Sequence, residues 1–158
     1  MRRGSWLGRR RARTPMAGAA LLVGVFTWLA MPGVAHASEH YLDINVSEQV
    51  LSEVVDGQVV DAIHISTGSG ESYWYEGEWW VAETPRGWFE VYAKEPGWVD
   101  GPLGALYDPL YFYEGYAVHG SSSVPDYPAS HGCVRVPLGV ADSLYDRIDI
   151  GTPVFVHD

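Results

Sequence analysis

Apolar residues between positions 41 and 156 occur mostly in short runs that turn-forming residues separate, a pattern typical of β-structure. The strongest local signal is Asp56-Gly57, which lies between the β-prone residues 49–55 and 58–65 and predicts a two-residue hairpin turn. Further runs of this character occupy residues 41–46, 79–82, 88–93, 110–112, 116–119 and 154–156. We therefore predict a mainly β fold.

One segment has a helical pattern instead. Leu138, Ala141, Leu144, Tyr145 and Ile148 recur at helical spacing, and a glycine shortly after them is a stop signal. This pattern predicts one short helix over residues 138–148. No repeat of fixed period and no low-complexity linker divides the chain, so we expect its 158 residues to hold a single domain behind an N-terminal leader.

The first residues have the order of an export signal. Arginines cluster in residues 2–13, an uncharged and largely apolar stretch covers residues 16–35, and Ala35-His36-Ala37 forms a small-x-small cleavage site. We predict a secretory signal peptide over residues 1–37 and a mature domain over residues 38–158. That domain is expected in the cell wall or the extracellular space, or in the periplasm if the host has an outer membrane. The alternative is a retained membrane anchor.

Loss of the leader changes the charge balance. Six of the 10 basic residues lie in it, whereas all 20 acidic residues follow it. The predicted mature domain keeps only Arg86, Lys94, Arg135 and Arg147. Because phosphate binding requires clustered basic side chains, nucleic acid is not expected as a partner.

The candidate chemistry centres on Cys133, the only cysteine of the chain. Two apolar runs flank the loop before it, so the chain can leave one strand at His119 and return beside it at Cys133. A thiol attacks a carbonyl as thiolate, and His119 or His131 can accept its proton. Gly132 lets a substrate carbonyl approach the backbone N–H groups of the turn. These parts suit acyl transfer through a thioester; the alternative is a buried, inert thiol.

These residues also carry a resemblance. Ser130-His131-Gly132-Cys133-Val134-Arg135, preceded by His119-Gly120, resembles the signature of the L,D-transpeptidase family, whose catalytic region is the YkuD domain. Ile-Ser-Thr-Gly at residues 65–68 and Thr-Pro-Arg-Gly-Trp-Phe at residues 84–89 resemble two further stretches of that family, in the same order. The loop over residues 120–129 is shorter than in many members, and some members have Asn at the position of Arg135.

The resemblance implies a YkuD-like β-sandwich with one short helix after the catalytic motif. It also implies an enzyme that attacks the L-to-D bond of peptidoglycan tetrapeptide stems, forms a thioester on Cys133 with His119 as base, and transfers the stem to an amine as a 3-to-3 cross-link. Gly120, Ser130, His131 and Gly132 are the expected oxyanion or motif support, the Gly120 carbonyl orienting the imidazole. Carbapenem-type β-lactams are the expected inhibitors, and neither a cofactor nor a metal is expected.

Several alternatives stay open at this stage. Arg135 either holds a stem carboxylate or forms a surface ion pair. Water resolving the same thioester would make the protein an L,D-carboxypeptidase. A zinc hydrolase would use His119, Asp126, His131 or Cys133, and a non-catalytic wall-binding module would leave the thiol idle. We expect the tryptophans to lie mostly in the core rather than to form ligand platforms; they are Trp74, Trp79, Trp80, Trp88 and Trp98.

Overall fold

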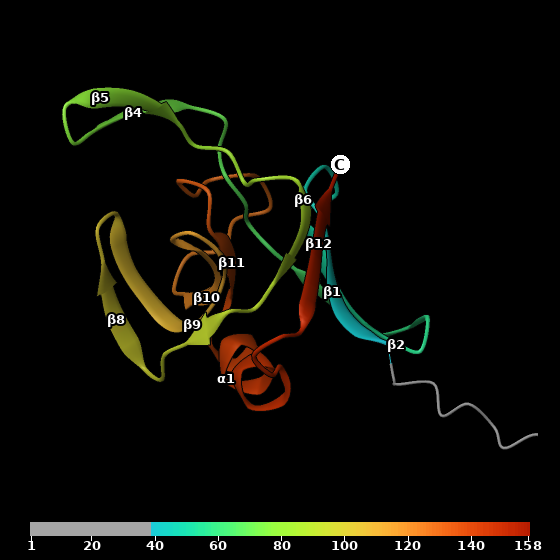
Figure 1. Cartoon of the computed structure of the whole chain (residues 1–158). Helices are drawn as coiled ribbons and strands as arrows, with labels where there is room; N and C mark the ends of the chain where they lie inside the picture. The colour runs from blue at the N-terminus through green and yellow to red at the C-terminus, as the bar shows by residue number, and fades with distance from the viewer. Residues whose placement is uncertain (1–38) are drawn as a thin grey trace, which may run out of the picture. The chain divides into compact units, whose positions relative to one another are not determined.

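The computed structural model describes residues 39–158, and the predicted leader over residues 1–37 lies outside them. Two β-sheets make up most of this part of the chain (Figure 1). The first sheet has the strand order β3-β2-β1-β12-β6. Its strands are β1 (His40–Asn45), β2 (Val50–Val55), β3 (Gln58–His64), β6 (Gly87–Glu90) and β12 (Pro153–His157).

The second sheet has the order β11-β10-β9-β7, and β8 pairs with β9 beside this path. Its strands are β7 (Ala93–Lys94), β8 (Trp98–Gly101), β9 (Gly104–Tyr113), β10 (Tyr116–Ser121) and β11 (Val134–Pro137). The helix α1 (Leu138–Arg147) begins directly after β11 and packs against β9, β10 and β11. The mainly β fold with one short helix after the motif is therefore confirmed.

The first sheet follows the local signals of the sequence closely. Asp56 and Gly57 have φ values of 52° and 75°, the left-handed conformations that a tight hairpin turn between β2 and β3 requires. The last strand, β12, then inserts beside β1 in parallel, with Leu42 opposite Val154. Strands from the two ends of the described chain thus lie at the centre of one sheet.

The hydrophobic core lies between the two sheets and under α1. Side chains alternate along each strand, so one face of every central strand is apolar and buried. The fully buried residues include Leu42, Ile44, Leu51, Leu110, Val118, Val134, Val136, Leu144, Ile148, Val154 and Val156. The apolar face of β10 and β11 therefore points into the core, which leaves their other face for chemistry.

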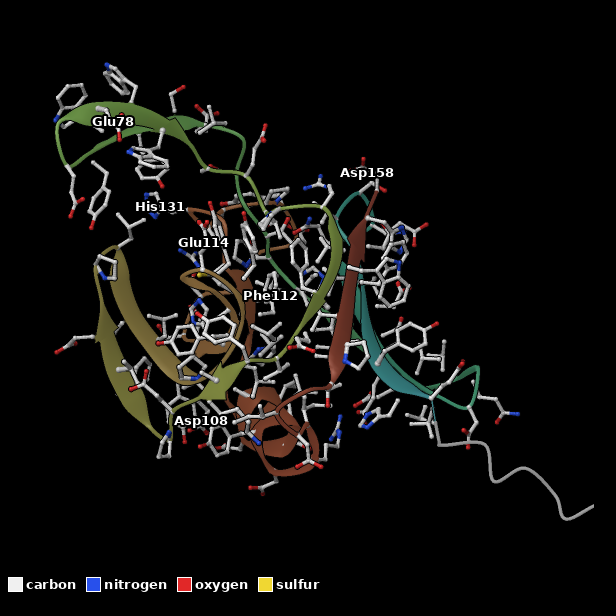
Figure 2. The ribbon with its side chains drawn as sticks, viewed as in Figure 1. Glu78, Asp108, Phe112, Glu114, His131 and Asp158 are labelled. Atoms are coloured by element: carbon white, nitrogen blue, oxygen red, sulfur yellow. The ribbon has the colours of Figure 1, made fainter. Side chains whose placement is uncertain are left out.

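A third unit, the hairpin of β4 (Ser72–Tyr75) and β5 (Glu78–Val81), pairs with neither sheet. Glu78 marks this hairpin in Figure 2. The expectation of mostly buried tryptophans is wrong here: Trp74 is 59% exposed and Trp79 is 69% exposed. The two indoles face each other across the strands, with ring centroids 5.5 Å apart. Because a lone hairpin has little core to bury side chains in, such cross-strand pairs have to stabilise it.

Trp80, Trp88 and Trp98 are exposed as well, so none of the five tryptophans expected in the core lies there. Two strands, β4 and β8, were not predicted from the sequence. The helix prediction is confirmed to within one residue. Over residues 39–158, no helix is long and apolar enough to cross a membrane.

Candidate functional site

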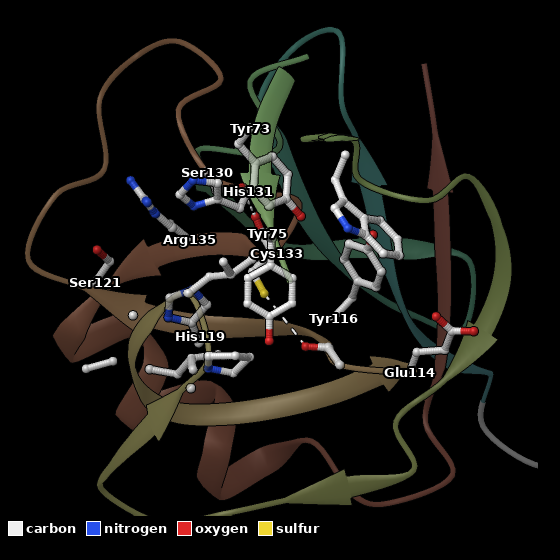
Figure 3. A pocket seen from close by; sticks show the side chains of 18 residues that line it. Tyr73, Tyr75, Glu114, Tyr116, His119, Ser121, Ser130, His131, Cys133 and Arg135 are labelled. Carbon is white, nitrogen blue, oxygen red and sulfur yellow. Dashed lines mark hydrogen bonds between the residues drawn. The ribbon is translucent and has the colours of Figure 1, made fainter. Parts of the chain in front are cut away.

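A pocket of about 300 Å³ opens over the second sheet, on the side away from the core. Cys133, His119 and Arg135 line it together with Tyr73 and Tyr75, and Figure 3 shows the Cys133 sulfur between the rings of His119 and Tyr116. Its walls come from three places: the inner face of the β4–β5 hairpin, the β8–β9 turn over residues 101–106, and the β9–β10 turn. Segments that lie far apart in the sequence therefore enclose one pocket.

Strand pairing explains why the two predicted catalytic residues meet. β10 and β11 are parallel, with Val118 opposite Val134 and His119 opposite Arg135. Val118 and Val134 point into the core, so their neighbours point to the opposite face. Cys133 immediately precedes β11 and lines the same pocket as His119 and Arg135. The return of the chain beside His119, predicted from two apolar runs, is observed.

His119 is buried, with 6% of its surface exposed. Its Nδ1 lies 2.9 Å from the Gly120 carbonyl oxygen, so that nitrogen donates a proton to the carbonyl and Nε2 is left as the free acceptor. Burial lowers the pKa of His119 to about 4, and the charge of Arg135 also lowers it, against the effect of the Gly120 carbonyl. The imidazole is therefore neutral at physiological pH.

Cys133 is a free cysteine that is partly buried. Burial raises the pKa of its thiol, although the backbone of Ala117 and the charge of Arg135 act in the opposite direction. Its sulfur lies 3.9 Å from the Gly115 carbonyl oxygen. Burial therefore disfavours the charged form of both groups, the thiolate of Cys133 and the imidazolium of His119.

The turn before the sulfur is held from both sides. The Ser130 hydroxyl accepts the Gly132 N–H at 2.9 Å and donates to the Cys133 carbonyl at 2.5 Å. From the other side the buried Thr84 hydroxyl donates to the Gly132 carbonyl at 2.8 Å and accepts the Gly68 N–H at 2.9 Å. Since the peptide is planar and trans, a fixed Gly132 carbonyl also fixes the direction of the Cys133 N–H.

Gly132 itself cannot be another residue without strain. Its φ of +133° is a backbone conformation that L-residues avoid, and a Cβ there would lie 2.7 Å from the Glu83 carbonyl oxygen. Position 120 requires glycine for a different reason, because a Cβ there would lie 2.9 Å from the Cβ of Ala141 on α1. Both glycines of the motif therefore serve close packing around the site.

Residues 65–68, which carried part of the family resemblance, anchor the loop that ends at the cysteine. Ser66 exchanges two backbone hydrogen bonds with Arg135, at 2.9 and 3.0 Å. The Thr67 carbonyl accepts the N–H groups of Ala129 and Ser130, both at 2.9 Å. Gln49 in turn holds Thr67 through both its backbone N–H and its hydroxyl. Backbone hydrogen bonds thus attach the predicted catalytic motif to the segment that follows β3.

Arg135 is the cation of the pocket. Over residues 39–158 it forms no ion pair, whereas Arg86 pairs with Asp158 and Arg147 pairs with Glu53 and Asp61. The surface ion pair considered from the sequence is therefore not observed. His131 lines the pocket rim, where its ring makes an edge contact with Tyr73, with centroids 4.7 Å apart.

The zinc hypothesis gains no support from the geometry. Asp126 does not line the pocket that holds His119, His131 and Cys133. Across the described residues, no three His, Cys, Asp or Glu side chains are gathered as metal ligands would be.

Several site residues were missed by the sequence analysis. Tyr73, Tyr75, Trp80 and Tyr116 form aromatic walls, and Glu114 stands at the rim. Thr84 was noted only as part of a similar stretch, with no role assigned. The Thr-Pro-x-Gly stretch upstream of the motif was the available sequence signal for Thr84. Its role could not be assigned from the sequence, because the hydroxyl reaches its hydrogen-bond partners only after the chain has folded.

The family model of the L,D-transpeptidase catalytic domain (YkuD) matches residues 39–156. A solved L,D-transpeptidase from Xylanimonas cellulosilytica is 44% identical, with a TM-score of 0.74; the match covers 80% of this chain and 64% of that one. The chain thus spans less than two thirds of that structure. A search of curated proteins gave no match.

Two mycobacterial structures share the fold at lower identity. An L,D-transpeptidase from Mycobacterium smegmatis is 24% identical with a TM-score of 0.64, over 77% of this chain and 59% of that one. L,D-transpeptidase 3 from Mycobacterium tuberculosis, in complex with a faropenem-derived adduct, is 20% identical with a TM-score of 0.60, over 77% and 61%. At these identities the likeness concerns the fold alone.

Proposed function

The chain belongs to the L,D-transpeptidase catalytic domain family, and on that premise we propose that it is an exported cysteine acyltransferase that forms 3-to-3 cross-links between peptidoglycan stem peptides. One observation carries the proposal. The Cys133 sulfur and an imidazole whose Nδ1 is engaged by the Gly120 carbonyl share one pocket, which leaves Nε2 free to act as a base.

The first half-reaction forms the thioester. His119 Nε2 takes the thiol proton, and the sulfur of Cys133 attacks the carbonyl carbon of the L-to-D bond. The Cys133 N–H, held in direction by the Thr84 contact to the Gly132 carbonyl, stabilises the oxyanion. The imidazolium then returns its proton to the nitrogen of the leaving D-alanine, and the stem stays on the sulfur.

The second half-reaction transfers the stem. An amine of a neighbouring stem attacks the thioester carbon, a new amide bond forms and the carbon–sulfur bond breaks. The sulfur ends as a thiol, because the proton of the attacking amine passes through His119 to it. Because burial disfavours both charged forms, we expect each proton transfer to accompany the making or breaking of the bond to sulfur.

Arg135 is proposed to hold a carboxylate of the donor stem. Arg135 lines the pocket, pairs with no acidic side chain within residues 39–158, and has a guanidinium whose planar fork binds a carboxylate through two hydrogen bonds. Its charge also helps to keep His119 neutral. The variant Arg135→Lys keeps the charge but loses the fork, so it should raise the KM for the tetrapeptide more than it lowers kcat.

Acylation by a carbapenem tests the proposal directly. The purified chain is incubated with the drug, its intact mass is measured, and the modified peptide is mapped. We expect one adduct on Cys133, absent from Cys133→Ala and strongly slowed in His119→Gln. Tetrapeptide stems should give cross-linked dimers with the unmodified chain and none with Cys133→Ala. Dimers formed by Cys133→Ala, or an adduct on any other residue, would refute the assignment.

An L,D-carboxypeptidase is the second candidate. The pocket opens to solvent and Cys133 is only partly buried, so water has a path to the thioester. Mass spectrometry of the products separates the two activities. Tripeptide without dimer, at an acceptor concentration well above that of the enzyme, would assign hydrolysis as the main reaction.

Export is the last part of the proposal. We propose that residues 1–37 are removed and that residues 38–158 act in the cell wall or beyond the membrane, because the order of basic cluster, apolar stretch and Ala-x-Ala site is that of a secretory signal. N-terminal sequencing of the chain recovered from the wall fraction should begin at Ser38. A cell-associated chain that still begins at Met1 would contradict this.

A further inference from the structure

The reaction proposed above needs a second substrate, and the pocket contains a residue suited to it. Glu114 lies at the rim, in the turn between β9 and β10. It immediately precedes Gly115, whose carbonyl oxygen is 3.9 Å from the Cys133 sulfur. The carboxylate of Glu114 therefore belongs to the residue next to Gly115, and Gly115 itself lies beside the sulfur that carries the acyl group.

Among residues 39–158, Glu114 is the one acidic residue that lines the pocket. Like most acidic side chains of residues 39–158, its carboxylate pairs with no Lys, Arg or His, so it is available to a ligand. Its backbone is left-handed, with φ of +46°, a conformation that glycine or asparagine would adopt at lower cost. The turn is held in place by Tyr92, whose hydroxyl donates to the Glu114 carbonyl.

The charges of the pocket are also separated in space. Figure 3 shows Arg135 on one side of the Cys133 sulfur and Glu114 on the other. The two substrates of a cross-linking reaction present opposite charges: the donor stem carries carboxylates, and the acceptor stem arrives with its side-chain amine as an ammonium ion. A cation and an anion on opposite sides of the nucleophile match a donor on the Arg135 side and an acceptor on the Glu114 side.

We propose that Glu114 binds the ammonium group of the acceptor stem and thereby directs the thioester toward an amine instead of water. The inference rests on the proposed function, and it adds the residue that selects the second substrate. Glu114 attracts the cation, and one ammonium proton is released to solvent as the amine enters. The free amine then attacks, so that thioester and ammonium ion give amide, thiol and one proton.

The test compares Glu114→Gln with the unmodified chain. Glutamine has the same shape and the same backbone cost at φ +46°, so only the charge is removed. Glu78→Gln is the matched control, because Glu78 is an exposed glutamate at the start of β5 that does not line the pocket. Three quantities are measured for each: the acylation rate with a carbapenem, the KM for an amine-bearing acceptor tripeptide, and the ratio of dimer to hydrolysed tripeptide.

We expect Glu114→Gln to acylate at the rate of the unmodified chain, to raise the acceptor KM about fivefold, and to lower the dimer-to-tripeptide ratio by a similar factor. Glu78→Gln should change none of these. The effect should shrink in about 0.5 M salt, which screens the ion pair. With a hydrazide acceptor, which is nucleophilic but uncharged at neutral pH, the variant and the unmodified chain should have the same KM.

The outcomes separate this inference from the function beneath it. If the unmodified chain is not acylated, the proposed function fails and the acceptor role fails with it. If acylation is intact and Glu114→Gln keeps the acceptor KM and the product ratio, only the role of Glu114 is overturned. A shift of equal size with the hydrazide would also overturn it, because that result indicates a change of shape rather than of charge.

Discussion

The hydrogen bonds of Thr84 lead to a specific prediction about the stability of the chain. Its side chain is 2% exposed, and its hydroxyl joins the Gly68 N–H to the Gly132 carbonyl through bonds of 2.9 and 2.8 Å. In Thr84→Val the shape is kept, but a buried donor and a buried acceptor both lose their partner. Each such loss costs about 1–3 kcal/mol, so we expect the free energy of unfolding to fall by about 3 kcal/mol.

Equilibrium urea denaturation of the purified chain measures this change. A loss of about 3 kcal/mol corresponds to a fall in Tm of roughly 10 °C for a domain of this size. Thr84→Ser is the matched control, because it keeps the hydroxyl and removes only a methyl group, which costs about 1 kcal/mol. Equal stability of Thr84→Val and Thr84→Ser would refute the reasoning, since the hydroxyl would then contribute nothing.

The same pair of variants tests whether Thr84 positions the nucleophile turn. Release of the Gly132 carbonyl lets the Cys133 N–H swing away from the oxyanion, so acylation by a carbapenem should slow about tenfold or more in Thr84→Val. Alkylation by iodoacetamide develops no oxyanion and should be unchanged. Thr84→Ser should restore the acylation rate. If both reactions slow by the same factor, the variant has damaged the thiol generally and the positioning role is wrong.

Two further predictions concern the same site. The pKa of His119 is about 4 in the folded chain against an ordinary 6.5, so between these pH values the unfolded chain binds a proton that the folded chain does not. The stability that this group contributes is therefore complete above pH 6.5, and about 3 kcal/mol of it is lost as the pH falls from 6.5 through 4. Urea titrations at stepwise pH should detect this loss, and the loss should be smaller in His119→Gln. Gly132→Ala forces a strained φ and a clash with the Glu83 carbonyl, so this variant should lose most of its acylation rate and about 2 kcal/mol or more of stability. Gly139→Ala is the control: Gly139 lies on α1 with open space around it, so this variant should unfold no more easily than the unmodified chain. Similar behaviour of both alanine variants would refute the packing argument.

The strands and the nucleophile could be predicted from the sequence because local chemistry determines them. Asp56-Gly57 adopts the left-handed turn that only such residues accept readily, and the alternating runs around it become β2 and β3. Leu138, Ala141 and Leu144 at helical spacing become α1, whose buried face includes Ala141 and Leu144. The proximity of His119 and Cys133 could also be predicted, because two apolar runs on either side of one polar loop favour pairing as neighbouring strands.

The environment of those residues could not be predicted in the same way. Whether the His119 imidazole is charged depends on burial that comes from strands distant in sequence, and that burial lowers its pKa to about 4. The exposure of Trp74 and Trp79 depends on the β4–β5 hairpin standing outside both sheets, which no composition or spacing reveals. Thr84, 48 residues before Gly132, had no local signal of a shared hydrogen bond.

The sequence alone therefore determined most of the elements and singled out Cys133 and His119 as the candidate pair, because turn preference, side-chain alternation and reactive groups are properties of short segments. The tertiary structure decided the burial that disfavours the charged forms of Cys133 and His119, the Thr84 contact that fixes the turn, and the placement of Arg135 and Glu114 on opposite sides of the sulfur. These features depend on solvent exclusion and on distances between segments, and both exist only after the two sheets and the hairpin have come together around the pocket.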